Sequence, residues 1–320
     1  MIDQEESERP PVAATSRVEQ AAGPASPATR PNALSLEDEA ELAQAFRALE
    51  DSSFAAYLTG MVGRQIGYAG ELVPGRVAAT ANKAAGAALR YALRAAVKSL
   101  PVDAQPASNR LHLAAVAASG AVGGAFGLAT LPLELPLSTT LMMRSVADIA
   151  REKGEDLSQP EAVLACLEVF ALGSSRDAGL GESSYFAIRA LLAKSVTEAA
   201  RYMIGRTIAD EAAPVLARLL GQIASRFGLV VTQKVVAQAV PLIGAVTGAG
   251  INAAFMDHYQ TLARGHFAVR RLERVYGADL VRAAYEKLRA NAADPQRRSV
   301  HDRVTRTPRR DNTAALPHSR

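Results

Sequence analysis

The residues best suited to chemistry lie in the last third of the chain, where Asp257 and His258 are followed by Arg264 and His266. A histidine acts as a general base when a partner orients it, and two histidines four residues apart on a helix can bind zinc. His258 and His266 are eight residues apart, which turns them about 80° from each other on a helix. We therefore expect polar structural contacts and no metal site, with a catalytic histidine as the alternative.

A single carboxylate, Glu134, stands between Pro132 and Pro136 in an otherwise apolar run. A buried carboxylate must find a partner or become neutral. We expect Glu134 to cap a helix or to pair with an arginine that the fold brings to it. A functional carboxylate in a cavity is the alternative, and Glu134, Asp257, His258 and His266 are then the candidate catalytic residues of a hydrolase-like enzyme.

Two further patterns suggest structure more than chemistry. Arg144, Asp148 and Arg151 recur at helical spacing, which predicts a charged stripe on one helix face. Residues 248–253 match the glycine pattern of a dinucleotide fingerprint, but that motif needs strands on both sides, and Glu273 lies in a charged helical stretch. We expect neither cofactor nor metal.

The elements that must position these side chains include two long segments that are nearly free of charge. Residues 111–143 contain one charged residue, and residues 235–256 contain none. Glycines four residues apart create smooth strips against which another helix can pack closely; here they are Gly120, Gly123, Gly124, Gly127, Gly244 and Gly248. Both segments are long enough to span a bilayer but only marginally hydrophobic. Buried core helices, shallow insertion and true spanning all remain open.

The rest of the pattern is helical, and no stretch alternates as a strand would. Ser35 with Asp38, and Ser158 with Glu161, have the spacing of capping boxes. We predict an all-α bundle, with helices over residues 35–50, 51–74, 76–99, 158–173, 183–204, 208–227, 250–273 and 278–290 in addition to the two glycine-spaced segments.

Composition indicates where the folded domain begins and ends and in which cellular compartment the protein resides. Residues 1–33 are acidic and proline-rich and residues 291–320 are arginine-rich, so we expect disordered tails around one helical domain at 34–290. The arginine tail lacks interleaved aromatic residues, which argues against specific nucleic-acid binding. The lone Cys166 excludes an internal disulfide, and the acidic N-terminus has no signal-peptide pattern. A cytoplasmic protein is expected.

Several motifs together resemble the bacterial EcsC family over about residues 80–285. They are LPLELP at 131–136, MRSVADIA at 143–150 with GEDL at 154–157, CLEVFALG at 166–173, SYFAIR at 184–189, IASRFG at 223–228, QAVPLIGA at 238–245, and FMDHY at 255–259 running into ARGHF at 263–267. The family is named from a protein encoded beside an exporter-type ABC transporter, and its activity is unassigned.

The resemblance implies a membrane-linked accessory role with ABC transporter components as possible partners. Together with the apolar segments, it leads us to expect a non-enzymatic protein that contacts anionic lipid at the inner face of the cell membrane. The alternatives are a soluble enzyme with an internal polar cavity and a helical scaffold for a protein partner. The sequence leaves the oligomeric state open.

Overall fold

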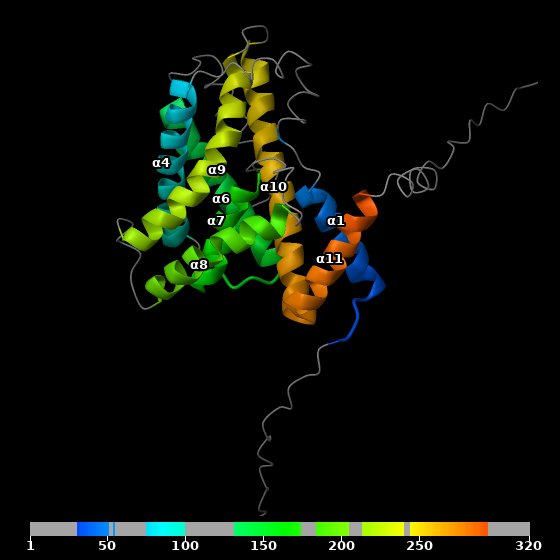
Figure 1. Ribbon diagram of the computed structural model, residues 1–320. Helices are drawn as coiled ribbons and strands as arrows, with labels where there is room; N and C mark the ends of the chain where they lie inside the picture. Colours follow the sequence, from blue (N-terminus) through cyan, green and yellow to red (C-terminus); the bar gives the residue numbers. More distant parts are fainter. Residues whose placement is uncertain are drawn as a thin grey trace, which may run out of the picture.

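The computed structural model describes residues 31–50, 54, 75–99, 131–173, 184–204, 213–239 and 244–293. These residues form eight helices and no strand, which confirms the all-α prediction (Figure 1). The helices are α1 (Leu36–Glu50), α4 (Gly75–Ser99), α6 (Leu131–Glu152), α7 (Pro160–Leu172), α8 (Ser184–Met203), α9 (Pro214–Ala239), α10 (Gly244–Tyr276) and α11 (Ala278–Ala293). The helix expected over residues 51–74 lies outside the described residues, apart from Phe54.

Local signals fix several helix ends. Ser35 caps α1, because its Oγ accepts a hydrogen bond from the Asp38 backbone N–H at 3.1 Å and donates one to the Asp38 carboxylate at 2.9 Å. Gly277 separates α10 from α11 in a left-handed conformation, with φ of 91°, which glycine adopts without strain. The capping box expected at Ser158 is wrong: the Ser158 hydroxyl donates to Asp156, and Gln159 is the N-cap residue of α7 and makes no side-chain cap hydrogen bond.

The structure does not show either glycine-spaced segment as one continuous helix. α9 runs through the strand-like residues 229–232 to Ala239, and α10 begins at Gly244. The described residues of the 235–256 segment therefore belong to two helices, and residues 240–243 lie outside the described residues. Gly244 and Gly248 lie in the first turns of α10, whereas Gly120, Gly123, Gly124 and Gly127 fall outside the described residues. α6 continues through Pro136, which stands one turn into the helix where few backbone bonds are lost.

The closest helix pairing joins α4 to α9. Gly228 lies beside Asn82 and Ala224 lies beside Gly86, so the two helices run antiparallel. A Cβ atom on Gly228 would overlap the Asn82 Oδ1 and stand 3.1 Å from the Asn82 Cα, so a side chain at this position would force Asn82 to move. Small residues thus serve helix packing here, at a glycine that the sequence patterns did not single out.

α10 is the longest helix and forms the centre of the bundle, with contacts to α1, α6, α7, α9 and α11 (Figure 1). Its middle carries a cluster of fully buried rings: Phe255 and Tyr259 pack against Phe227 of α9, and Tyr259 also meets Phe170 of α7. Aromatic edge-to-face and offset contacts of this kind add to the stabilisation from burial. The polar side chains described below are held by this rigid centre.

Candidate functional site

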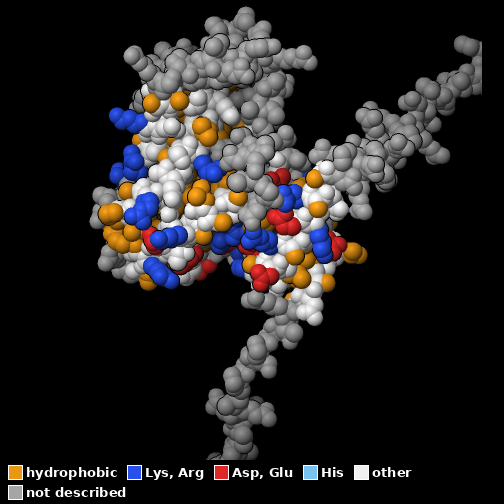
Figure 2. All heavy atoms as spheres, viewed as in Figure 1, with side chains coloured by type: hydrophobic (Ala, Val, Ile, Leu, Met, Phe, Trp, Pro, Cys, Tyr) orange, Lys and Arg blue, Asp and Glu red, His pale blue; other side chains and the backbone are white. Residues whose placement is uncertain are grey.

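The most uneven charge distribution lies on the α4–α9 pair. These two helices contain eight Lys and Arg residues and no Asp or Glu. On their outer sides Lys83, Arg90, Arg94 and Arg218 are exposed. We call the exposed residues of α4 and α9 the basic face; Figure 2 shows Lys and Arg side chains over these helices with hydrophobic side chains between them.

Two large apolar side chains project from the same helices. Tyr91 of α4 is 55% exposed and Leu229 of α9 is 54% exposed. Exposed apolar residues set among cations are typical of surfaces that contact lipid head groups. Sequence reasoning missed this face because it considered the net charge of the whole central region, which is nearly neutral. That sum hides the two stretches without acidic residues, 75–99 and 214–239.

Around α1 and the C-terminal half of α10, the charged side chains form ion pairs with one another. Arg271 of α10 binds both Asp38 and Glu41 of α1, and Lys153 donates to Glu41 at 2.6 Å. Arg270 holds Glu155 through two hydrogen bonds of 2.9 and 3.0 Å. Burial alone would raise the pKa of Glu155, but the hydrogen bonds and charge of Arg270 lower it. This network fastens α1 and the α6–α7 connection to α10.

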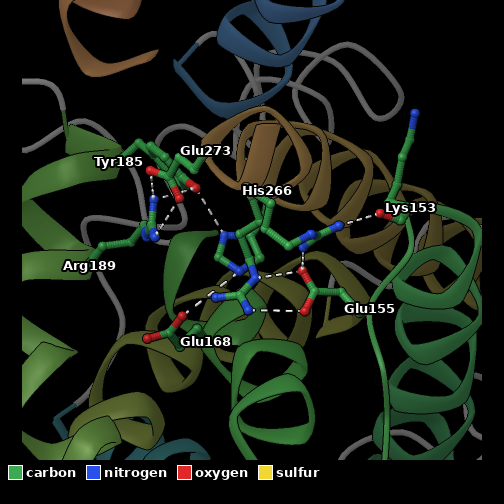
Figure 3. Close-up of polar contacts among 9 residues, drawn as sticks. Lys153, Glu155, Glu168, Tyr185, Arg189, His266 and Glu273 are labelled. Carbon is green, nitrogen blue, oxygen red and sulfur yellow. Dashed lines mark hydrogen bonds and ion pairs between the residues drawn. The ribbon is translucent and has the colours of Figure 1, made fainter. Parts of the chain in front are cut away.

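A second polar cluster is buried between α7, α8 and α10 (Figure 3). The His266 Nδ1 lies 3.1 Å from the Tyr185 hydroxyl, and Arg189 donates to that hydroxyl at 3.3 Å. Arg189 also binds Glu273 through two hydrogen bonds of 2.7 and 3.0 Å. On its other side, the His266 Nε2 stands 3.8 Å from the Glu168 Oε2, too far for a hydrogen bond.

Burial dominates the electrostatics of this cluster. It raises the pKa of Glu168 to about 7, against the opposing effect of Arg189 and Arg270. Burial and the same two arginines hold the pKa of His266 well below its usual range. His266 was a candidate from sequence, whereas Glu168 and Tyr185 were not, although Glu168 stands in an apolar run of residues just as Glu134 does.

Glu134 has an ion-pair partner, but the partner is a lysine and not the arginine expected. The Lys234 Nζ of α9 lies 2.8 Å from the Glu134 Oε1 and 4.9 Å from the centre of the Phe255 ring. Lys234 is fully buried. Burial lowers the pKa of Lys234, and the charge of Glu134 opposes that shift.

The other catalytic candidates are not brought together. Asp257 is exposed, while its neighbour His258 is buried against Phe54 and Tyr259. Burial lowers the pKa of His258 to about 4, opposed by a hydrogen bond with the Gly173 backbone. His266 lies eight residues further along the helix, about 12 Å along the axis.

Two surface hollows, of about 340 and 410 Å³, occur elsewhere, between α1, α6 and α10 and beside α11. Neither is lined by any of these four candidates. Where the chain is described, no three His, Cys, Asp or Glu residues are grouped so that they could hold a metal ion.

The charged stripe on α6 is only partly as expected. Arg144 is exposed, but Asp148 is buried and pairs with Arg151 at 3.0 Å. Arg264 is exposed and donates to Gln260 at 3.4 Å. Cys166 is buried, and burial raises the pKa of its thiol, so it has the environment of an inert core cysteine.

Comparison with known proteins gives one match. The model of the EcsC protein family matches residues 79–272, which extends from α4 to the last turns of α10. Both helices of the basic face and the Glu168–His266 cluster fall within that range. Searches of curated proteins and of solved structures found no match.

Proposed function

We propose that this chain, which belongs to the EcsC protein family, is a non-enzymatic accessory protein that binds the anionic surface of a membrane through its basic face. The observation that carries the proposal is the set of exposed cations on α4 and α9, two helices that contain no acidic residue. Each Lys or Arg near an anionic leaflet contributes about 1 kcal/mol of attraction. Arg218 is paired with Glu198 at 3.4 Å, and Lys83 and Arg90 alone would contribute about 2 kcal/mol.

Binding at the surface fits the structure better than crossing the bilayer. Among the described helices, only the stretch Pro214–Ala237 of α9 has the length and composition to cross a membrane, with a mean hydropathy of 1.3. Half of that stretch is buried inside the protein, as in a core helix of a bundle. Tyr91 and Leu229 would then act as shallow anchors at the level of the head groups.

The inner leaflet of the cell membrane is the surface that we propose, because cytoplasmic leaflets are rich in anionic lipid. A partnership with ABC transporter components, which the family resemblance implies, would act at the same surface. Neither of the two surface hollows is lined by the four polar candidates for catalysis, and we propose no reaction.

Fractionation of cells that express the tagged full chain tests this proposal. We expect the protein in the membrane pellet at low salt and its release by high salt or carbonate, since salt screens exposed charges. The double variant K83E/R90E should move to the soluble fraction. A wild-type protein that is soluble at low salt, or that only detergent releases, would contradict surface binding.

A further inference from the structure

Glu168 is a buried carboxylate whose environment does not satisfy it. Its residue is 6% exposed, and no described residue donates a hydrogen bond to it. The Nε2 of His266 lies 3.8 Å from the Glu168 Oε2, and that nitrogen has no hydrogen-bond partner among the described residues. A carboxylate that is buried without a hydrogen-bond donor is costly, and binding a proton removes much of that cost.

The surrounding charges do not neutralise Glu168. From α8 it faces Arg189 and Tyr185, and from α10 it faces Arg270 and Glu273 beside His266. Arg189 is already held by Glu273 through two hydrogen bonds, and Arg270 by Glu155 through two more. α4, α6 and α9, which also pack on α7, contribute no group to those that shift the pKa of Glu168. Both described cations that act on Glu168 are therefore already bound to another carboxylate.

We propose that Glu168 and His266 form a buried proton-binding pair, in which a protonated Glu168 carboxyl faces the unprotonated Nε2 of His266 across 3.8 Å and releases its proton to water as the pH rises. This assignment is independent of the membrane proposal. With the proton bound, the His266 Nδ1–H donates to the Tyr185 hydroxyl, which also accepts from Arg189. Without it, the single proton of the neutral imidazole stands on Nε2, Tyr185 donates to Nδ1, and a buried negative charge remains on Glu168.

The loss of the proton therefore weakens the packing of α7 on α8 and α10. Burial raises the pKa of Glu168 to about 7, which places this change near neutral pH. Glu168 lies within two turns of the C-terminal end of α7, and Tyr185 lies in the first turn of α8.

Carboxyl ¹³C NMR of the full chain, selectively labelled at glutamate and titrated from pH 5 to 9, tests the pair directly. We expect one carboxyl, assigned by its connection to the Glu168 backbone, to titrate near pH 7. Because this titration is read in the unmodified protein, it does not depend on a variant that folds. The absence of any glutamate that titrates above pH 6 would overturn the proposal.

Thermal unfolding of E168Q gives the second measurement, with E161Q as the matched control, because Glu161 is exposed on the same helix. Glutamine keeps the shape of the carboxyl but carries no charge. The melting temperature of E168Q relative to wild type should rise by several degrees between pH 5.5 and 8, while E161Q shows no such trend. Parallel pH profiles for E168Q and wild type would contradict the assignment.

Discussion

The Lys234 ammonium lies 2.8 Å from the Glu134 carboxylate in the interior of the bundle, one hundred residues away along the chain. The pair joins the C-terminal half of α9 to the first turns of α6, and the ring of Phe255 on α10 lies beside the ammonium. Three helices thus meet at one buried charge pair. Desolvation makes such a pair costly to break and of little net benefit compared with apolar residues.

Replacing Lys234 with Met should therefore destabilise the protein by about 3–5 kcal/mol, because the Glu134 charge is left buried without its partner. Urea denaturation followed by circular dichroism measures the change. The double variant E134Q/K234M should recover most of the loss. K194M is the control: Lys194 is 86% exposed, and its replacement should change stability by less than about 0.5 kcal/mol. A K234M protein as stable as wild type would show that the pair does not hold these helices.

Two glycines of α9 should respond in opposite directions to alanine. At Gly221 a Cβ atom meets nothing within 4 Å, so G221A should stabilise the helix by about 0.5–1 kcal/mol. At Gly228 the Cβ would collide with Asn82, so G228A should destabilise the protein by about 1–3 kcal/mol. Melting temperatures of the two variants give the comparison. Equal shifts would mean that α4 and α9 do not approach as closely as described.

His258 should make the protein less stable in mild acid. Burial lowers its pKa to about 4, whereas the value in an unfolded chain is 6.5. Between these pH values His258 binds more protons in the unfolded state, so its contribution to the free energy of unfolding falls as the pH drops from 6.5 to 4, opposite in sign to the contribution of Glu168. The contribution is at most about 3 kcal/mol. H258Q should remove this slope in urea titrations at each pH, and an unchanged slope would place the titrating group elsewhere.

The sequence was sufficient for features that depend on near neighbours. Ser35 and Asp38 begin α1 as their spacing predicts, and Pro160 stands in the first turn of α7. Residues 229–232 favour a strand by type, yet they are helical because α4, α7, α8 and α10 surround α9. Tertiary packing overrides weak local preference in such a stretch.

The candidate site was less accessible to sequence reasoning, for physical reasons. An ion pair for Glu134 could be expected from its apolar surroundings, but its partner Lys234 depends on how two distant helices meet. His266 was recognisable as a polar residue in a core helix, whereas its neighbours Tyr185 and Glu168 come from other helices. Residues 111–130 of the first glycine-spaced segment lie outside the described residues, so their close packing against another helix stays a prediction.

Vesicle binding of the purified full chain tests the central claim most directly. Wild type should bind vesicles that contain phosphatidylglycerol and should not bind pure phosphatidylcholine. K83E/R90E should bind at least about 30-fold more weakly, because two cations contribute about 1 kcal/mol each. The control R144E/K287E makes the same change in net charge at exposed positions on α6 and α11 and should bind within about threefold of wild type. All three proteins keep residues 294–320, so the tail contributes equally. K83E/R90E binding as tightly as R144E/K287E would contradict a membrane role for the basic face.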